Sequence, residues 1–250
     1  MTQSMNQAMN QPIALAPGAA PVALVTGVGP GTGSALARRF AAGGYRCALL
    51  ARDASRIEAL AASLPGAIAV PCDVADEAAV AAAYATVVET LGAPGVVLHN
   101  AVLGARGDFL TVEPRHVRRA LEVNVMGLLH VARACAPAML AAGCGSIVVT
   151  GNTAAHRGRA NFAGMAPSKA AQRILAESMA RRLGPEGVHV SYLTIDAVID
   201  VPWTREAFAG RPDDFYTRPD DLAEACWTLA HQPRSAWTFE MAVRPFGETW

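Results

Sequence analysis

Short apolar runs, spaced through the chain from residue 22 onward and separated by alanine-rich stretches, constrain the fold more than any other feature. The runs read PVALVT, YRCALLA, AIAVP, GVVLHN, SIVVT and VHVSYLTI. None alternates polar with apolar residues, which is typical of strands in a parallel sheet that is covered on both faces. Because parallel strands need crossover connections, the intervening stretches are predicted to be helices. The sequence therefore predicts one α/β domain, a doubly wound parallel sheet flanked by helices on both faces.

Length and composition fit one such domain. The chain has 250 residues, of which 52% are hydrophobic and 17% charged, so a sizeable core can be buried. No internal repeat or low-complexity linker divides it. Residues 1–17 are polar and lack a basic start followed by a long apolar run, so we expect a disordered tail and not a signal peptide. The domain is expected to span residues 18–250.

Charge and cysteine usage exclude several classes of function. The 21 Lys and Arg residues balance 21 Asp and Glu residues, and no basic stripe interleaved with aromatic residues suggests a nucleic-acid partner. The five cysteines are scattered, which predicts no metal site and no disulfide framework and indicates a reduced, cytoplasmic setting. No uncharged apolar segment approaches the roughly 18 residues that a membrane span needs, so no membrane partner is expected.

The stretch LVTGVGPGTGSALARRF predicts a binding site for a dinucleotide. A strand ends in it, glycines follow, and a helix begins. Glycines permit a tight turn and let the backbone approach a phosphate, and the helix N-terminus offers free N–H groups. In this position, between the first strand and the first helix, the pattern is specific. The expected binding residues are Thr26, Gly27, Gly29, Gly31, Thr32 and Gly33.

The end of the second strand, LLARD, indicates which dinucleotide binds. In such folds an acid at this strand end contacts the adenosine ribose, whereas an arginine accommodates a 2′-phosphate. Ala51 stands where the acid is expected, and Arg52 follows it. This arrangement favours NADP over NAD. The alternative is that Arg52 and Asp53 are simply a solvated pair.

The chain resembles the short-chain dehydrogenases/reductases over nearly everything from residue 22 to 247. The motifs that carry the resemblance are TGVGPGTG, CDV, HNA, NVMG, GSIVVTGN and SKAA. The resemblance implies a single Rossmann-like domain, hydride transfer to or from a nicotinamide, and a homodimer or homotetramer. It also implies that Asp73 and Val74 flank the adenine and that Asn100 and Ala101 line the cofactor cleft.

Two of the four catalytic positions of that family are replaced in this chain. Asn124 in NVMG and Lys169 in SKAA match the family, and Lys169 is expected to hold the nicotinamide ribose. Met165 stands where the family has a tyrosine, and Asn152 stands where it has a serine. Met165 cannot protonate an alkoxide, whereas Asn152 can still donate a hydrogen bond to a carbonyl oxygen. Cofactor binding is therefore expected, while the usual acid/base route is broken.

Two further groups are candidates for the missing chemistry. His156 lies four residues after Asn152 on a loop that should face the substrate, and histidine is a natural acid or base. The alternative is a solvated histidine among arginines, in a loop that could attract an anionic substrate. Asp196 lies where the family has the glycine of a proline–glycine pair, so it could bind the nicotinamide carboxamide or cap a helix.

Three functions follow, of which the sequence favours the first and leaves the other two as alternatives. The first is an NADP(H)-dependent oxidoreductase that reduces a carbonyl or an activated C=C bond, with the proton coming from water, His156 or the substrate. The second is a catalytically silent NADP-binding protein or partner subunit. The third is a lyase or isomerase that reuses the cleft. Residues 199–219 should form a lid over a small-molecule substrate, with aromatic residues suggesting an apolar pocket. The apolar helix around residues 123–140 predicts self-association.

Overall fold

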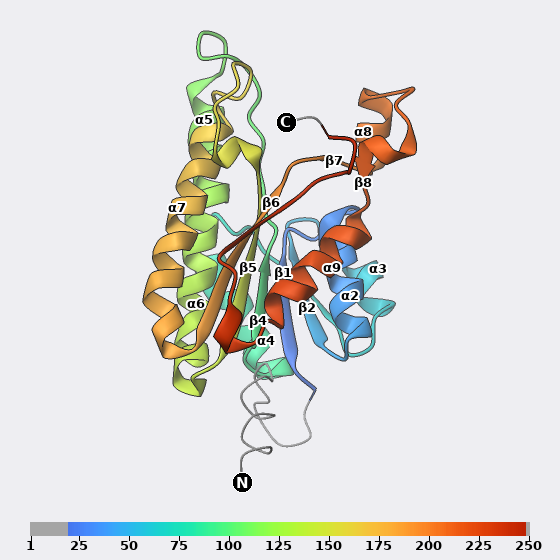
Figure 1. The fold of residues 1–250 in the computed structure, drawn as a ribbon. Helices are drawn as coiled ribbons and strands as arrows, with labels where there is room; N and C mark the ends of the chain where they lie inside the picture. The colour runs from blue at the N-terminus through green and yellow to red at the C-terminus, as the bar shows by residue number, and fades with distance from the viewer. Residues whose placement is uncertain (1–19, 249–250) are drawn as a thin grey trace.

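A computed structural model describes residues 20–248, and the predicted tail, residues 1–17, lies outside them. A seven-stranded sheet forms the centre of the fold, in the order β3-β2-β1-β4-β5-β6-β9 (Figure 1). Every neighbouring pair in it is parallel. The strands are β1 (Val22–Thr26), β2 (Arg46–Ala51), β3 (Ile68–Pro71), β4 (Val96–His99), β5 (Gly145–Asn152), β6 (Val188–Ile195) and β9 (Glu240–Val243).

Helices cover both faces of this sheet, as Figure 1 shows. One layer holds α2 (Thr32–Ala42), α3 (Ala54–Ala62) and α9 (Pro219–Ala230). The other holds α4 (Glu77–Leu91), α6 (Gly127–Ala142) and α7 (Ala166–Leu183), with α5 (Pro114–Leu121) leading into α6. The predicted fold class, a doubly wound parallel sheet with helices on both faces, is confirmed.

Each central strand is apolar throughout because its alternate side chains enter two different cores. In β1, Val22 and Leu24 pack under α4 and α6, whereas Ala23 and Val25 pack under α2 and α9. Sheet strands with a helical layer on each side bury both faces in this way. The two layers leave the carboxyl ends of the strands open to one side.

The order of the strands creates a crevice at those carboxyl ends. After β3, at one edge, the chain crosses to β4 on the far side of β1. The connections therefore diverge between β1 and β4, and ligands of open α/β sheets bind at such a switch point. The glycine-rich loop follows β1 directly, so this loop opens into the crevice.

Residues that follow β6 make an excursion over the crevice. Two short parallel strands, β7 (Val198–Ile199) and β8 (Tyr216–Thr217), tie its base together. Between them lie α8 (Pro202–Ala207) and a 3-10 turn. Arg205 organises this segment: its guanidinium pairs with Asp200 and Asp213 at 2.6 Å each and lies 4.0 Å from the ring centre of Tyr216. The β7–β8 pair is not evident in the sequence, because two-residue strands carry no periodic signal.

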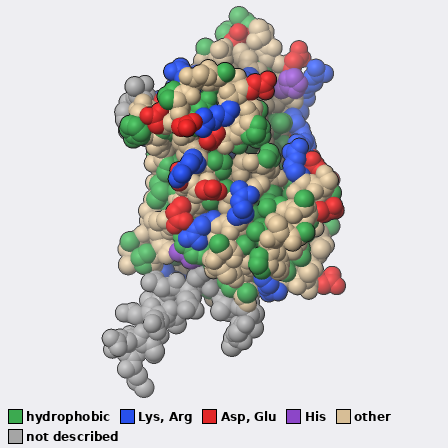
Figure 2. Space-filling view, turned by 90° about the vertical axis from the view of Figure 1, so that its right-hand side faces the viewer, with side chains coloured by type: hydrophobic (Ala, Val, Ile, Leu, Met, Phe, Trp, Pro, Cys, Tyr) green, Lys and Arg blue, Asp and Glu red, His purple; other side chains and the backbone are tan. Residues whose placement is uncertain are grey.

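The helical run Pro114–Ala142 is, by length and composition alone, apolar enough to cross a membrane. In this fold the run packs on the sheet, and Leu128, Val131 and Met139 belong to the core between α4 and β5. Core helices pass the same test of length and composition, so this is weak evidence for a membrane span. Figure 2, which views the face around α2, α8 and α9, shows Arg side chains interspersed with Asp and Glu rather than forming a continuous basic surface.

Candidate active site

The glycine-rich loop between β1 and α2 is too tight to admit side chains. Gly27 has a φ of +66°, and a Cβ there would stand 2.5 Å from the Cα of Ala101. A Cβ on Gly33 would stand 2.5 Å from the carbonyl oxygen of Gly27. No side chain caps the start of α2, and the Thr32 hydroxyl is buried without a hydrogen-bond partner among the described residues. Such a helix N-terminus, with free donors and an orphaned hydroxyl, fits a phosphate group.

The end of β4 holds the glycine-rich loop in place. The side-chain amide of Asn100 donates to the Gly27 carbonyl at 3.0 Å, and the Thr150 hydroxyl donates to the Asn100 side-chain oxygen at 2.9 Å. The Thr26 hydroxyl accepts the backbone N–H groups of Asn100 and Ala101 at 3.2 and 3.4 Å. Thr26 and Ala101 therefore shape the crevice from behind, whereas Asn100 lines it.

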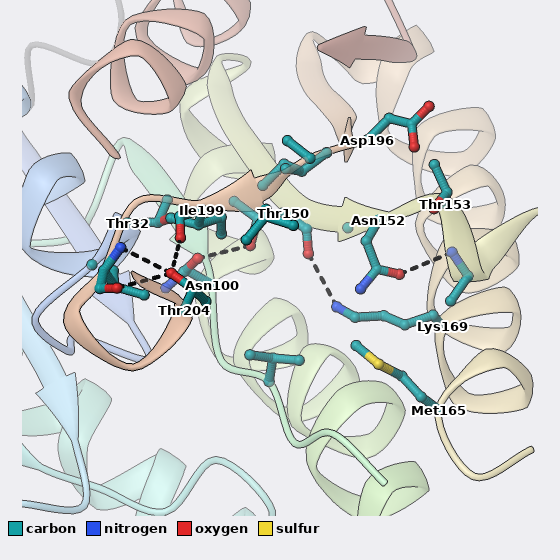
Figure 3. Close-up of a pocket in the computed structure, with 18 of the residues that line it drawn as sticks. Thr32, Asn100, Thr150, Asn152, Thr153, Met165, Lys169, Asp196, Ile199 and Thr204 are labelled. Carbon is teal, nitrogen blue, oxygen red and sulfur yellow. Dashed lines mark hydrogen bonds between the residues drawn. The ribbon is translucent and has the colours of Figure 1, made fainter. Parts of the chain in front are cut away.

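A cleft of about 730 Å³ occupies the crevice, between the glycine-rich loop, the end of β5, the start of α7 and the 199–219 segment. Figure 3 shows the side chains that point into it. The structure brings together many of the residues predicted from sequence: Gly27, Gly29, Gly31, Thr32, Gly33, Asn100, Asn152, Met165, Lys169 and Asp196 line this one cleft.

Lys169 is the single lysine of the protein, and it lies at the inner end of the cleft. Its side chain is 1% exposed, and its amine donates to the Thr150 carbonyl at 3.2 Å and to the Gln172 side-chain oxygen at 2.8 Å. Burial disfavours the charged ammonium and lowers the pKa of Lys169 to about 7. The amine is therefore poised to change its protonation state near neutral pH.

Gln172 links Lys169 to the helix that crosses behind it. Its side-chain oxygen accepts from Lys169, and its side-chain nitrogen donates to the Asn124 carbonyl at 2.8 Å. That carbonyl lies in a π-helical turn, η1 (Glu122–Met126), where the wider hydrogen-bonding pattern frees backbone groups for other partners. Gln172 is completely buried, so its amide is held by these two hydrogen bonds and by packing.

Asn124, predicted as catalytic, does not line the cleft. Its side-chain oxygen accepts the N–H of Leu103 at 2.8 Å, and its amide donates to the Leu103 carbonyl at 3.0 Å and to the Ser168 hydroxyl at 2.8 Å. The side chain thus fastens the loop after β4 to α7. The path from Asn124 to the cleft runs through its backbone carbonyl and Gln172.

The buried amine of Lys169 should make stability depend on pH. Its pKa is about 7 in the fold against 10.5 ordinarily, so between these values the unfolded chain binds a proton that the folded chain does not. The free energy of unfolding should therefore rise from pH 7 towards pH 10.5, with a slope from this group of up to about 1.4 kcal/mol per pH unit. The contribution is full above pH 10.5 and is lost as pH falls to about 7.

Urea unfolding at pH 7 and pH 9 measures this effect, with Lys169→Met as the reference. The difference between the parent and the variant isolates the lysine from the other titrating groups. Equal pH dependence in the two proteins would contradict the lowered pKa.

Asn152 and Met165 lie beside Lys169 and point into the same space (Figure 3). The side-chain oxygen of Asn152 accepts the N–H of Ala154 at 3.1 Å, which fixes the amide and leaves its nitrogen with no partner among the described residues. Met165 occupies the N-cap position of α7, one helical turn before Lys169. The backbone N–H of Lys169 donates to the Met165 carbonyl at 3.0 Å. The cleft thus presents an amide donor and a thioether next to a buried amine.

The residues predicted to hold the adenosine end lie outside this cleft. Arg52 is exposed just after β2, and Val74 is buried, with its carbonyl accepting from His130 at 3.1 Å. Asp73 pairs with Arg119 at 2.5 Å. Asp53 stands at the N-cap position of α3 and accepts from the hydroxyl of Ser55 at 2.8 Å.

His156 is the residue that the sequence predicts as a substitute acid. It does not line the cleft: its Nε2 lies 2.7 Å from a carboxylate oxygen of Glu240 and 3.2 Å from the Thr194 hydroxyl. Glu240 starts the edge strand β9 and also binds Arg173 at 2.6 Å. The carboxylate at the sheet edge draws the histidine away from the substrate side, an interaction between residues too distant in sequence to predict.

Asp196 lines the cleft, but its carboxylate is already engaged. Arg157 approaches it at 3.3 Å and Arg244 at 3.8 Å.

The sequence analysis did not identify Gln172 or Arg106 as residues of the site. The available signal for Gln172 was a polar residue on the buried face of a helix, three positions after Lys169, where the two side chains share a face.

Comparisons with known proteins agree with this geometry. The family model of the short-chain dehydrogenases matches residues 21–209. D-erythrulose reductase of Gallus gallus is 34% identical over 173 residues, 68% of each chain. An alcohol dehydrogenase of Thermococcus sibiricus, solved in complex with 5-hydroxy-NADP, has a TM-score of 0.83 and 27% identity, over 92% of this chain and 98% of that one. A metagenomic short-chain oxidoreductase in complex with NADP has a TM-score of 0.79 and 29% identity, over 91% and 98%.

Proposed function

The chain belongs to the short-chain dehydrogenase family, and from that premise we propose that it is an NADP(H)-dependent oxidoreductase with a non-standard active site. It would reduce a carbonyl or an activated C=C bond. In this proposal Met165 and Asn152 take the positions of the catalytic tyrosine and serine of the family. The observation that carries the proposal is the cleft itself, which Asn152, Met165 and Lys169 line together with the glycine-rich loop.

Several features support NADP(H) as the cofactor. The free N–H groups of α2 and the orphaned Thr32 hydroxyl would hold the pyrophosphate, and Asn100 and Lys169 would hold the nicotinamide ribose. Two similar structures contain NADP or 5-hydroxy-NADP. When bound, NADPH supplies the hydride.

Arg52 should set the preference for NADP(H) over NAD(H). It stands exposed at the end of β2, where Ala51 brings no carboxylate to repel a phosphate. We expect the parent to bind NADPH more tightly than NADH, and Arg52→Ala to lose about tenfold in NADPH affinity, since hydrogen bonds to charged groups contribute about 1.5–3 kcal/mol. Fluorescence titration of both cofactors measures this, with Arg56→Ala as a control on the neighbouring helix. Equal affinity of the parent for both cofactors would contradict the assignment.

Asn152 would polarise the substrate. Its free side-chain nitrogen can donate to the oxygen of a bound carbonyl, which favours the charge that develops there as hydride reaches the carbon. When a conjugated C=C bond is reduced, the same donor would stabilise the enolate. Met165 would contribute an apolar contact and no proton.

Lys169 would supply the proton. In the reduction of a ketone the hydride adds to carbon, the electron pair of the C=O bond moves to oxygen, and that oxygen takes a proton. Among the cleft-lining residues, Lys169 has a pKa near neutrality, which suits general acid catalysis. With His156 turned towards Glu240, Lys169 replaces it as the candidate acid, acting directly or through a water molecule.

NADPH oxidation tests the proposal against a panel of ketones, enones and enoyl thioesters. Turnover of any member, lost in Lys169→Met even at NADPH concentrations that saturate the variant, supports it. NADPH binding without turnover of any class would support the second candidate, a catalytically silent NADP-binding protein. The hydrogen bonds of the Lys169 amine to Gln172 and to the Thr150 carbonyl favour the silent protein, because they already engage the amine with acceptors of the protein.

Other parts of the proposal concern the whole molecule. Leu121, Met126 and Ile174 are apolar and exposed on α5–α7, which supports a homodimer or homotetramer through these helices. All five cysteines are free thiols, which supports a reducing, cytoplasmic setting. We also infer one domain from residue 18 to 250, in which the segment tied by β7 and β8 is the substrate lid.

A further inference from the structure

We propose that the substrate carries an oxyanion, a carboxylate or a phosphate, on an apolar body, and that Arg106 and Arg159 bind this group at the rim of the cleft. This inference rests on the proposed reductase function, because it names the substrate class of the same cleft. It also predicts anion binding that can be measured without turnover.

The charge at the cleft is unbalanced although the protein as a whole is neutral. The described lining residues include four basic side chains and two carboxylates: Arg106, Arg157, Arg159 and Lys169 against Asp196 and Glu248. Arg157 is bound to Asp196, which Arg244 also approaches. The local field is therefore positive, and a cleft with such a lining attracts anions.

Arg106 and Arg159 differ from the other cleft-lining arginine in their partners. Neither makes an ion pair or a side-chain hydrogen bond with any residue that the structure describes, and both are exposed. The carboxylates that could neutralise them lie elsewhere: Asp196 is bound to Arg157, and Glu248 lies more than ion-pair distance from either arginine. Two guanidinium groups are thus left available on the rim, and guanidinium forks match carboxylate and phosphate geometry.

Backbone hydrogen bonds join the two loops that carry these arginines. The loop after β4 and the loop before α7 are joined by an isolated bridge between Gly107 and Phe162. The Gly107 N–H donates to the Asn161 carbonyl at 3.1 Å, and the Ala163 N–H donates to the Gly107 carbonyl at 3.2 Å. Arg106 precedes this bridge directly, and the Arg159 carbonyl accepts the N–H of Phe162 at 2.9 Å. The arginines therefore sit on a joined backbone, which reduces the entropy lost when an anion binds.

Large apolar side chains line the outer part of the cleft together with a few threonines, and they describe the body of the substrate. Phe162 and Met165 contribute from the loop before α7, and Trp203, Phe208 and Phe215 contribute from the segment tied by β7 and β8. The reacting carbonyl would lie at Asn152 and Lys169, at the inner end. A carbonyl compound with an apolar chain ending in an oxyanion satisfies both ends of the cleft.

Matched substrates test the inference. We would compare three substrates: 6-oxoheptanoate, its methyl ester and 6-oxoheptyl phosphate. Each is measured with the parent, with the double variant Arg106→Gln/Arg159→Gln, and with the control Arg115→Gln, which changes an exposed arginine outside the cleft lining. The parent should prefer an anion over the ester by about tenfold in kcat/KM, as two partly exposed charge-assisted pairs allow. The double variant should lose most of this preference through KM, and the control should keep it. The ratio of acid to phosphate identifies which oxyanion is preferred.

A second measurement separates this inference from the reductase function. Calorimetric binding of heptanoate and heptyl phosphate to the NADP-saturated protein needs no turnover. Binding that the double variant loses, in a protein that reduces nothing, would leave the anion site standing while the reductase proposal fails. Reduction of the ester as fast as the acids, with no anion binding in the parent, would overturn the anion site and leave the reductase proposal intact.

Discussion

Met165→Tyr combined with Asn152→Ser is expected to raise NADPH-dependent reduction of simple ketones by about a hundredfold, the lower end of what a positioned acid supplies. Met165 lines the cleft one helical turn before Lys169, so a phenol there would lie on the same helical face as the amine. The ammonium of Lys169 would favour the phenolate and lower the pKa of the new tyrosine. The serine would replace the amide of Asn152 as the donor to the substrate oxygen.

Met165→Phe combined with Asn152→Ser is the matched control, because it introduces the same ring without the hydroxyl. Initial rates with acetophenone and cyclohexanone, at saturating NADPH, compare the two double variants. A folded, NADPH-binding tyrosine variant that is no faster than the phenylalanine variant would contradict the prediction. It would indicate a cleft reshaped around other chemistry, in which Met165 contacts an apolar substrate.

The sequence predicted the architecture because the local signals agree with the global fold. Strands such as β1 are apolar on both sides because two helical layers cover them, and that signal is readable in a window of five residues. The glycine-rich loop was equally predictable, since only glycine fits where a Cβ would stand 2.5 Å from the backbone. The cleft positions of Asn152, Met165 and Lys169 followed from their fixed spacing around β5 and α7.

Contacts between distant segments were not predictable from the sequence. His156 turns towards Glu240, which lies 84 positions further along the chain and reaches it only because β9 pairs with β6. The bond between Gln172 and the Asn124 carbonyl is made to a π-helical turn, which leaves no periodic trace in the sequence. The bridge between Gly107 and Phe162 likewise joins two irregular loops, those that carry Arg106 and Arg159.

Gln172 should control the protonation of Lys169, and substitutions there should move the pKa of the amine in opposite directions. Gln172→Glu places a carboxylate where the amide oxygen lies 2.8 Å from the amine, which should raise the pKa of Lys169 by about 1–3 units. Gln172→Met keeps the length of the side chain but removes the acceptor, so the charged ammonium loses a partner and the pKa should fall further below its ordinary value. The chain holds a single lysine, so isotope-labelled lysine gives one side-chain resonance, and its titration reads the pKa directly.

The pH dependence of catalysis should follow the same order if Lys169 supplies the proton. A donor acts while it is protonated, so kcat/KM should fall as pH rises through the pKa of Lys169, which is about 7 in the parent. The fall should occur at higher pH in Gln172→Glu and at lower pH in Gln172→Met. Ile174→Glu, which adds a carboxylate to the exposed side of the same helix, should leave both the titration and the profile within a few tenths of a pH unit of the parent, because solvent screens exposed charges.

If the lysine resonance moves in the two Gln172 variants while the rate profile does not, the amine responds to Gln172 but another group, or water, delivers the proton. If the resonance titrates at the same pH in all four proteins, burial alone sets the pKa and the bridge from Asn124 through Gln172 is only structural.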